Sequence, residues 1–437
     1  MGQNSLLPRE RAILVGVVLP RMNREETDDH LDELARLTET AGGTVIDRVV
    51  QERGHPDAAY FVGRGKAVEI AAHARGLHAD LIVFDDDLSP AQVKNLEKVI
   101  EAKVIDRSGL ILDIFARRAR TKEARTQVEL AQLNYLLPRL TRRWTHLSRQ
   151  EGGIGVRGIG ETQIEIDRRL IRKRISHLRG DLDRIERARQ TRRTGRRGVP
   201  KGALVGYTNS GKSTLLNALT RAEAFVEDRL FATLDPLVRR CEVSPGRSVL
   251  LIDTVGFIRK LPHHLVASFR STLEEAAEAD FLLHVVDISH PQYEEHMSVT
   301  QQVLSGLGMS ERPTILIFNK IDMVTQAGVL ERARRVYPGA LQIAAGRGIG
   351  LELVLAEIER LLADDLVESR IRLFSGDSER ISKVYEQAHV VDASYHDGVV
   401  DLTFKTSRAR AFALARLTSP DDTGFGDVPG PGREAAS

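Results

Sequence analysis

The sequence has little of what marks exported, disulfide-bonded or membrane-spanning proteins. It contains one cysteine, Cys241, among 437 residues, so no intramolecular disulfide can form. A lone cysteine is typical of a reducing compartment, which predicts a cytoplasmic protein. No apolar run approaches the ~20 residues of a membrane-spanning helix. The longest run near the start, residues 12–19, follows no charged leader and indicates a buried strand. Peripheral attachment to a membrane stays open.

Net charge is scarce in the whole chain but not in one segment. The formal net charge is +2, and 42% hydrophobic with 28% charged residues is typical of a folded soluble protein. Residues 116–197 alone hold 23 Lys and Arg against nine Asp and Glu, a net charge of +14. This excess favours a basic surface that neutralises phosphate groups. The alternative is a solvated helix with many surface ion pairs.

The first part of the chain, to about residue 115, alternates strand and helix patterns. Strands are expected over 12–19, 44–50, 81–84 and 104–105, and helices over 27–40 and 66–74. Another helix is expected to begin at Pro90, with Ser89 as its N-cap. This alternation predicts a parallel sheet covered by helices.

Two long helices are predicted next, over 121–137 and 161–190. Apolar residues in the second helix follow a heptad spacing, which favours an antiparallel hairpin. The connecting loop, 151–161, has glycine at five of its nine inner positions, so its backbone can approach another surface closely. A plain flexible connector is the alternative. The candidate RNA-binding residues of this hairpin are Arg142, Arg143, Arg157, Arg172, Lys173 and Arg179.

A phosphate-binding loop is predicted at residues 206–213, after a strand over 203–205 and before a helix over 214–219. Its sequence, Gly-Tyr-Thr-Asn-Ser-Gly-Lys-Ser, matches G-x-x-x-x-G-K-S. The glycines let backbone N–H groups face phosphate oxygens, and the helix start adds its positive dipole end. Lys212 is expected to reach the β- and γ-phosphates and Ser213 to ligate Mg²⁺. The nucleotide-binding residues predicted here are Gly206, Tyr207, Thr208, Asn209, Ser210, Gly211, Lys212, Ser213 and Thr214.

Further motifs follow in the order of a GTPase domain. A predicted strand over 249–253 ends in Asp253-Thr-Val-Gly256. An aspartate at this place holds Mg²⁺, here through a bound water, and the Gly256 N–H can contact the γ-phosphate. Between this motif and the phosphate loop, Phe231 and Thr233 belong to a candidate switch segment, with Thr233 as an Mg²⁺ ligand. The predicted Mg²⁺ site therefore comprises Ser213, Thr233 and Asp253.

Guanine selectivity is predicted from a strand over 314–318 followed by Asn319-Lys320-Ile-Asp322. The Asp322 carboxylate can accept hydrogen bonds from guanine N1–H and N2–H₂, a donor pair that adenine lacks. Asn319 and Lys320 would brace and cover the base. In the last base-binding element, Ala344 stands where serine is usual, and Ala345 still offers its backbone N–H. The loop thereby lacks a side-chain hydrogen bond of roughly 0.5–1.5 kcal/mol, so guanine preference is expected to be looser than usual.

No catalytic residue can be assigned with certainty. Phe257 occupies the position after D-x-x-G where Ras-like proteins have the glutamine that orients water. Lys212 and Gly256 remain as groups that stabilise the transferred phosphate. We therefore expect slow intrinsic hydrolysis, accelerated by a partner that supplies or positions the missing group; in Ras such assistance is worth about 10⁵-fold.

Together these motifs resemble the HflX family of ribosome-associated GTPases over nearly the whole chain. Phe257 is the residue expected in that family, whereas Ala344 departs from its pattern, and the match is weakest after about residue 366. The segments that carry the resemblance are Tyr60–Lys66, Asp106–Phe115, Gly152–Gln163, Phe231–Pro236 and Asp253–Phe257 followed by Leu261-Pro-His.

The resemblance implies a GTPase that uses Mg²⁺ and binds the large (50S) ribosomal subunit. Some family members split stalled ribosomes. The N-terminal region and hairpin would bind 23S rRNA, with the glycine-rich loop near the peptidyl transferase centre. Two alternatives stay open: a GTPase that times ribosome assembly, and a nucleotide-driven rRNA remodeller that also uses ATP. An RNA-binding module with a vestigial nucleotide site is disfavoured by the complete phosphate loop. A monomer is expected.

The predicted fold is a multidomain α/β protein. The N-terminal α/β domain is expected to lead into the basic hairpin, and a linker into a Ras-like doubly wound GTPase domain. A small C-terminal αβ domain, with a strand over 395–404 and a helix over 408–417, would end in a disordered tail. The predicted boundaries are 1–118, 119–192, 193–201, 202–365, 366–419 and 420–437.

Overall fold

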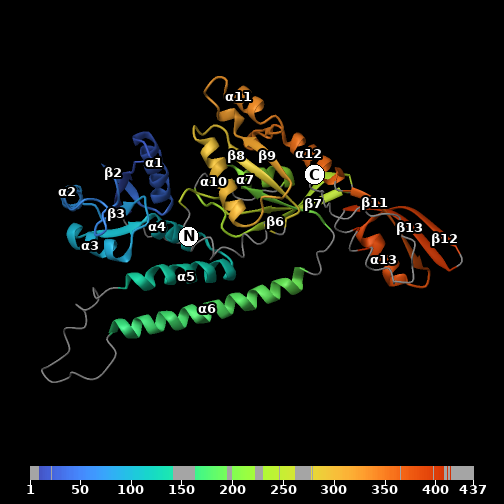
Figure 1. Ribbon diagram of the computed structural model, residues 1–437, viewed down its shortest axis with the longest axis horizontal. Helices are drawn as coiled ribbons and strands as arrows, with labels where there is room; N and C mark the ends of the chain where they lie inside the picture. The colour runs from blue at the N-terminus through green and yellow to red at the C-terminus, as the bar shows by residue number, and fades with distance from the viewer. Residues whose placement is uncertain are drawn as a thin grey trace, which may run out of the picture.

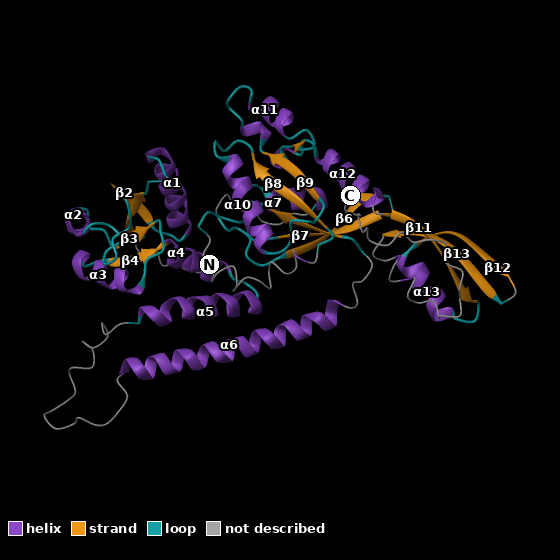
Figure 2. Ribbon diagram, viewed as in Figure 1, coloured by secondary structure: helices purple, strands orange, loops and turns teal. Residues whose placement is uncertain are grey.

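A computed structural model gives the arrangement of three sheets and a long helical hairpin (Figure 1). The N-terminal and C-terminal sheets lie on opposite sides of the central sheet, and the hairpin runs beneath the N-terminal and central domains (Figure 2). No helix among the described residues is long and apolar enough to cross a membrane. The structure describes residues 9–20, 22–140, 163–193, 199–221, 230–245, 247–260, 277, 279–364, 366–396, 398–407, 411 and 414.

The N-terminal domain is a parallel sheet of strand order β2-β1-β3-β4, as the alternating pattern predicted. Apolar residues of β1 alternate between the two faces, so α1 and α4 cover one face while α2 and α3 cover the other. The elements are β1 (Arg11–Val18), α1 (Arg24–Thr40), β2 (Thr44–Glu52), α2 (Arg64–Gly76), β3 (Leu81–Phe84), α3 (Pro90–Ile100), β4 (Lys103–Asp106) and α4 (Arg107–Arg118).

Two helix starts in this domain are fixed by caps. Ser89 caps α3 as expected, and its hydroxyl accepts from the N–H of Gln92. Helix α1 begins three residues before the predicted Thr27, because Asn23 and Glu26 form a capping box ahead of the first apolar position.

The hairpin consists of α5 (Lys122–Leu136) and α6 (Gln163–Arg193), which lie side by side (Figure 1). Leu130 of α5 packs on Ile175 and Leu178 of α6, two residues of the predicted heptad stripe. The guanidinium of Arg174 adds two hydrogen bonds, of 2.7 and 2.8 Å, to the Glu129 carboxylate. The glycine-rich loop lies outside the described residues.

The central sheet is doubly wound and mixed, with strand order β10-β9-β8-β5-β7-β6. Only β6, at the edge, is antiparallel to its neighbour among the described strands. Helices α7 and α12 pack on one face, and α10 and α11 on the other. The elements are β5 (Lys201–Val205), α7 (Lys212–Thr220), β6 (Leu237–Ser244), β7 (Arg247–Asp253), β8 (Phe281–Asp287), α10 (Tyr293–Gly306), β9 (Thr314–Asn319), α11 (Val329–Val336), β10 (Leu341–Gln342) and α12 (Leu351–Asp364).

The C-terminal sheet corrects one prediction. The segment expected to be a single strand over 395–404 is instead parts of two antiparallel strands, because the chain reverses beside Gly398, whose φ is +83°. The helix expected over 408–417 lies almost wholly outside the described residues. This domain contains β11 (Leu366–Phe374), α13 (Ser378–Gln387), β12 (His389–His396) and β13 (Val399–Ser407), with sheet order β11-β13-β12.

Candidate functional site

The predicted phosphate loop connects β5 to α7, as the motif requires. Gly206 has a φ of +147°, and a Cβ there would lie 2.2 Å from the carbonyl oxygen of Val285. Gly211 has a φ of +94°, and its Cβ would meet the Asn319 amide at 2.2 Å. Both positions therefore require glycine. The sharp turns that they make direct the loop around the start of α7.

Lys212 lies at the bottom of this loop and is almost completely buried. Its ammonium group donates to the carbonyl oxygens of Tyr207 (2.7 Å) and Gly206 (3.1 Å), which holds the side chain along the loop. Burial lowers its pKa to about 8, while the charge of Asp253 acts in the opposite direction. An added phosphate charge would favour the protonated form further.

The three residues predicted to form the Mg²⁺ site are brought together. The Ser213 hydroxyl lies 2.8 Å from that of Thr233 and donates to the Asp253 carboxylate over 2.5 Å. Burial raises the pKa of Asp253, and its Oδ1 is buried with no hydrogen-bond partner among the described residues. A buried carboxylate oxygen without a partner, next to two hydroxyls, is a donor set that suits a hard cation such as Mg²⁺.

The guanine motif follows β9 and joins three parts of the site. Asn319 donates from its amide to the Ser210 carbonyl (2.9 Å), and its Oδ1 accepts from the Ala345 N–H (3.0 Å). The Lys320 ammonium pairs with Asp287 at 2.7 Å. Thus the phosphate loop and the last base-binding element are tied through one side chain.

Two details differ from the sequence-based expectation for guanine. The Ala345 N–H, expected to be free for the base, is used by Asn319. The Asp322 carboxylate pairs with Arg347, whose Nε lies 3.4 Å from Oδ2 of Asp322. Ala344 is buried, and its N–H and carbonyl pair with Ile349.

Phe257 points away from the phosphate site. Its side chain is buried in the apolar cluster with Ala203, Val205 and Leu282. Its N–H donates to the Gly206 carbonyl (3.1 Å), and its carbonyl accepts from the Thr208 N–H (2.7 Å). Its side chain therefore cannot orient water, and its backbone fixes the segment after Gly256 to the phosphate loop.

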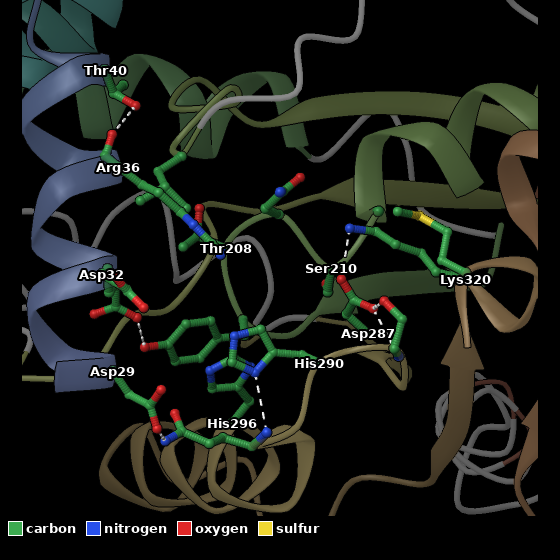
Figure 3. Close-up of a pocket in the computed structure, with 18 of the residues that line it drawn as sticks. Asp29, Asp32, Arg36, Thr40, Thr208, Ser210, Asp287, His290, His296 and Lys320 are labelled. Atoms are coloured by element: carbon green, nitrogen blue, oxygen red, sulfur yellow. Dashed lines mark hydrogen bonds and ion pairs between the residues drawn. The ribbon is translucent and has the colours of Figure 1, made fainter. Parts of the chain in front are cut away.

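These elements open into a cleft of about 1210 Å³ between the central domain and α1 of the N-terminal domain (Figure 3). One wall carries the phosphate loop and the base-binding motifs, with Ser210 and Lys320 labelled in the figure. The opposite wall is the polar face of α1, which sequence reasoning missed. The available signal was the spacing of Asp29, Asp32, Glu33, Arg36, Glu39 and Thr40, opposite the apolar stripe of that helix.

Segment 253–260, called switch II below, contacts the N-terminal domain through charges. Glu33 of α1 accepts a hydrogen bond from the Tyr207 hydroxyl and pairs with the buried guanidinium of Arg107. Lys260 pairs with Asp85 at 2.7 Å. Burial raises the pKa of Asp85, but the charges of Arg107 and Lys260 more than offset it and leave this pKa lowered. Arg259 lies between Glu33 (3.7 Å) and Glu295 (3.4 Å).

Segment 230–236, called switch I below, also contacts the N-terminal domain. The ring of Phe231 packs edge-on against Phe115 of α4, with centroids 4.8 Å apart. Asp235 accepts hydrogen bonds from the N–H of Arg120 (2.9 Å) and from the N–H and hydroxyl of Thr121. Since Thr121 is the N-cap of α5, switch I reaches the first helix of the hairpin directly.

Three of the candidate RNA-binding residues, Arg172, Lys173 and Arg179, are exposed on α6. The other three, Arg142, Arg143 and Arg157, lie outside the described residues. The described part of the hairpin thus presents cations to solvent on its longer helix.

Three family descriptions match successive parts of the chain. Residues 28–116 match "GTP-binding GTPase N-terminal", and residues 118–196 match "GTP-binding GTPase Middle Region". Residues 201–320 match "50S ribosome-binding GTPase". These matches follow the N-terminal sheet, the hairpin and most of the central domain.

Curated relatives agree with this division. The chain is 43% identical to GTPase HflX of Escherichia coli over 397 residues, which is 90% of this chain and 92% of the relative. It is 52% identical to GTPase HflX of Flavobacterium psychrophilum over 313 residues, covering 72% and 76% of the two chains. A solved structure, that of a GTP-binding protein from Sulfolobus solfataricus in complex with GDP, is 24% identical with a TM-score of 0.42 and covers 81% of this chain and 99% of its own. From the curated relatives and the matched families, we conclude that the chain belongs to the HflX family of GTPases and binds and hydrolyses GTP.

Proposed function

We propose that this GTPase associates with the large ribosomal subunit in the cytoplasm and splits stalled or vacant ribosomes, with hydrolysis stimulated by the ribosome. The observation that carries the proposal is the pair of contacts from switch I to the hairpin. Switch I contains a predicted γ-phosphate sensor, Thr233. Two residues later, Asp235 accepts hydrogen bonds from Arg120 and from Thr121, the N-cap of α5. A GTP-dependent movement of switch I would therefore reach the basic hairpin.

The charge of the hairpin supports an RNA partner. The net charge of +14 over residues 116–197 already counts every Asp and Glu of that segment, so ion pairs within it, such as Arg174–Glu129, leave the excess unchanged. Contacts of such cations with phosphates would supply affinity without base specificity. The family description "50S ribosome-binding GTPase" supports the large subunit as the source of that RNA. The RNA that we propose is 23S rRNA, with loop 151–161 near the peptidyl transferase centre.

The nucleotide roles predicted from the motifs form part of the proposal. Ser213 and Thr233 would hold Mg²⁺ directly, and Asp253 would hold it through water. The ion would neutralise charge on the β- and γ-phosphates. Lys212 would contact the same phosphates, and the Gly256 N–H would face the γ-phosphate. Asp322 would select guanine after releasing Arg347. With Phe257 buried, ribosomal RNA or protein would complete the hydrolytic site.

The experiment is sedimentation and light scattering of ribosomes with the full-length protein and a non-hydrolysable GTP analogue. We expect binding to large subunits and a fall in scattering as 70S particles separate. Replacing residues 152–160 by a serine linker should spare nucleotide binding and abolish splitting. Retained splitting would make this loop only a connector.

The alternative of an assembly-timing GTPase predicts binding to immature subunits only, with no splitting of mature ribosomes. The alternative of an ATP-using remodeller rests on Ala344, and it predicts ATP hydrolysis comparable to GTP hydrolysis. Asp322→Asn separates it from the main proposal, because that change should shift preference from GTP toward xanthosine triphosphate. Unchanged selectivity would remove Asp322 from base recognition.

A further inference from the structure

Helix α1 turns a polar face to the nucleotide cleft, although it belongs to another domain. Asp29, Glu33, Arg36 and Thr40 follow one another at intervals of four, three and four residues, which places them on one side of a helix. All four line the cleft together with residues of the phosphate loop. The cleft therefore has a wall that a lone GTPase domain would lack.

The position of this wall is set by contacts at Glu33 and at Asp29, one turn before it. Glu33 accepts from the hydroxyl of Tyr207, the second residue of the phosphate loop. One turn earlier, Asp29 accepts from the side-chain amide of Gln292. Because α1 is attached at these points, Arg36, one turn after Glu33, has a fixed place above the loop.

Arg36 is an exposed cation in this place. Figure 3 shows its side chain extending from α1 toward Thr208 of the phosphate loop. Among the described residues no carboxylate pairs with its guanidinium. Two acidic neighbours are engaged elsewhere, since Asp32 pairs with Arg48 and Glu33 with Arg107.

The neighbourhood of Thr208 belongs to the outer end of the phosphate site. A Cβ at Gly256 would lie 2.6 Å from the Thr208 Cα, so these backbones touch. Thr208 and Asn209 also line the smaller cavity that contains Lys212, Thr233 and Gly256. A guanidinium that extends toward Thr208 across the cleft is therefore directed to the side of the site where GTP and GDP differ.

We propose that Arg36 is a nucleotide-binding residue supplied by the N-terminal domain, and that its guanidinium contacts the γ-phosphate of GTP. A planar guanidinium can donate two hydrogen bonds to one phosphate, which suits an outer phosphate with free oxygens. The contact stabilises the GTP-bound state and makes nucleotide preference depend on how the N-terminal domain is placed. It adds a cation to the site and does not replace the missing water-orienting group.

The test is titration of the full-length protein with fluorescent GDP and a fluorescent non-hydrolysable GTP analogue in the presence of Mg²⁺. Arg36→Ala should weaken the GTP analogue about tenfold, the effect of losing a hydrogen bond between charged groups, and change GDP affinity less than twofold. Arg24→Ala is the matched control, because Arg24 lies on α1 outside the cleft and pairs with Asp28. It should leave both affinities unchanged.

Two results would overturn the proposal: wild-type affinity of R36A for the GTP analogue, or equal weakening of GDP and the analogue. GDP binding also reports whether the variant is folded. If R36A does not fold, Arg36→Gln keeps the length of the side chain without its charge, and the same two results decide. No ribosomes are present, so the outcome is independent of the proposed ribosomal function.

Discussion

Switch I and switch II flank the same phosphate site, yet the N-terminal domain and the hairpin hold them by different means. Switch I is held by the ring contact between Phe231 and Phe115 and by the hydrogen bonds of Asp235. Switch II is held by ion pairs from Arg259 and Lys260 to carboxylates of the N-terminal domain. The two segments therefore contact different parts of the molecule. Switch I contacts α4 and the start of the hairpin, whereas switch II contacts α1 and Asp85, which directly follows β3.

Loss of the carboxylate of Glu33 should lower the free energy of unfolding more than loss of the switch I hydrogen bonds. In Glu33→Ala the buried Arg107 loses one of its two carboxylate partners, Asp85 being the other. Removing one partner of a buried ion pair typically costs 3–5 kcal/mol, so we expect the free energy of unfolding to fall by about 3 kcal/mol. Urea denaturation measures this change. Asp32→Ala, on the exposed side of the same helix, should change it by less than about 0.5 kcal/mol. An equal effect of the two variants would contradict a stabilising buried ion pair between Glu33 and Arg107.

Breaking the contact between switch I and the hairpin should lower stability less, but it should reduce the stimulation of hydrolysis by large subunits more. Asp235→Ala removes hydrogen bonds to Arg120 and Thr121 on an exposed surface, and we expect a loss of about 1 kcal/mol. Because Thr233 is untouched, hydrolysis without ribosomes should stay near wild type. Stimulation by large subunits should fall at least tenfold, which phosphate-release assays would measure. Full stimulation of D235A would show that switch I does not act through the hairpin.

The smallest expected effect concerns acid sensitivity beside switch II. His296 stacks on Tyr207, and burial, followed by the charges of His290 and Arg259, lowers its pKa to about 3. The unfolded chain takes up this proton below about pH 6.5, whereas the folded chain does so only near pH 3. Stability is therefore present above pH 6.5 and falls as the pH drops toward 3. His296→Phe keeps the stacking, so it should lose about 1 kcal/mol less than wild type between pH 7.5 and 5.5 in urea titrations. An unchanged pH dependence would contradict burial of a neutral imidazole.

Much of the fold and the nucleotide motifs could be predicted because their signals are local. The glycines at 206 and 211, the N-cap at Ser89 and the heptad stripe of α6 each depend on neighbours within a few residues. Edge strand β6 was missed, since its half-exposed residues lack a clear apolar alternation.

The interface was beyond prediction from one sequence. Its pairs, such as Lys260 with Asp85, join residues 175 positions apart. Each charge looks like an ordinary surface residue until the domains meet. The same holds for Phe231, which could be read as part of a switch but not as the partner of Phe115. Local pattern identifies the chemistry of the site, whereas the second wall of the cleft depends on tertiary packing.

The most direct test of the account is GTP hydrolysis by the full-length protein with and without purified large ribosomal subunits, with ATP in parallel and D235A beside wild type. The account predicts slow hydrolysis alone, strong GTP-selective stimulation by the subunits, and loss of that stimulation in D235A. Hydrolysis that large subunits leave unchanged would contradict a ribosome-triggered switch and would favour a different RNA partner for the basic hairpin.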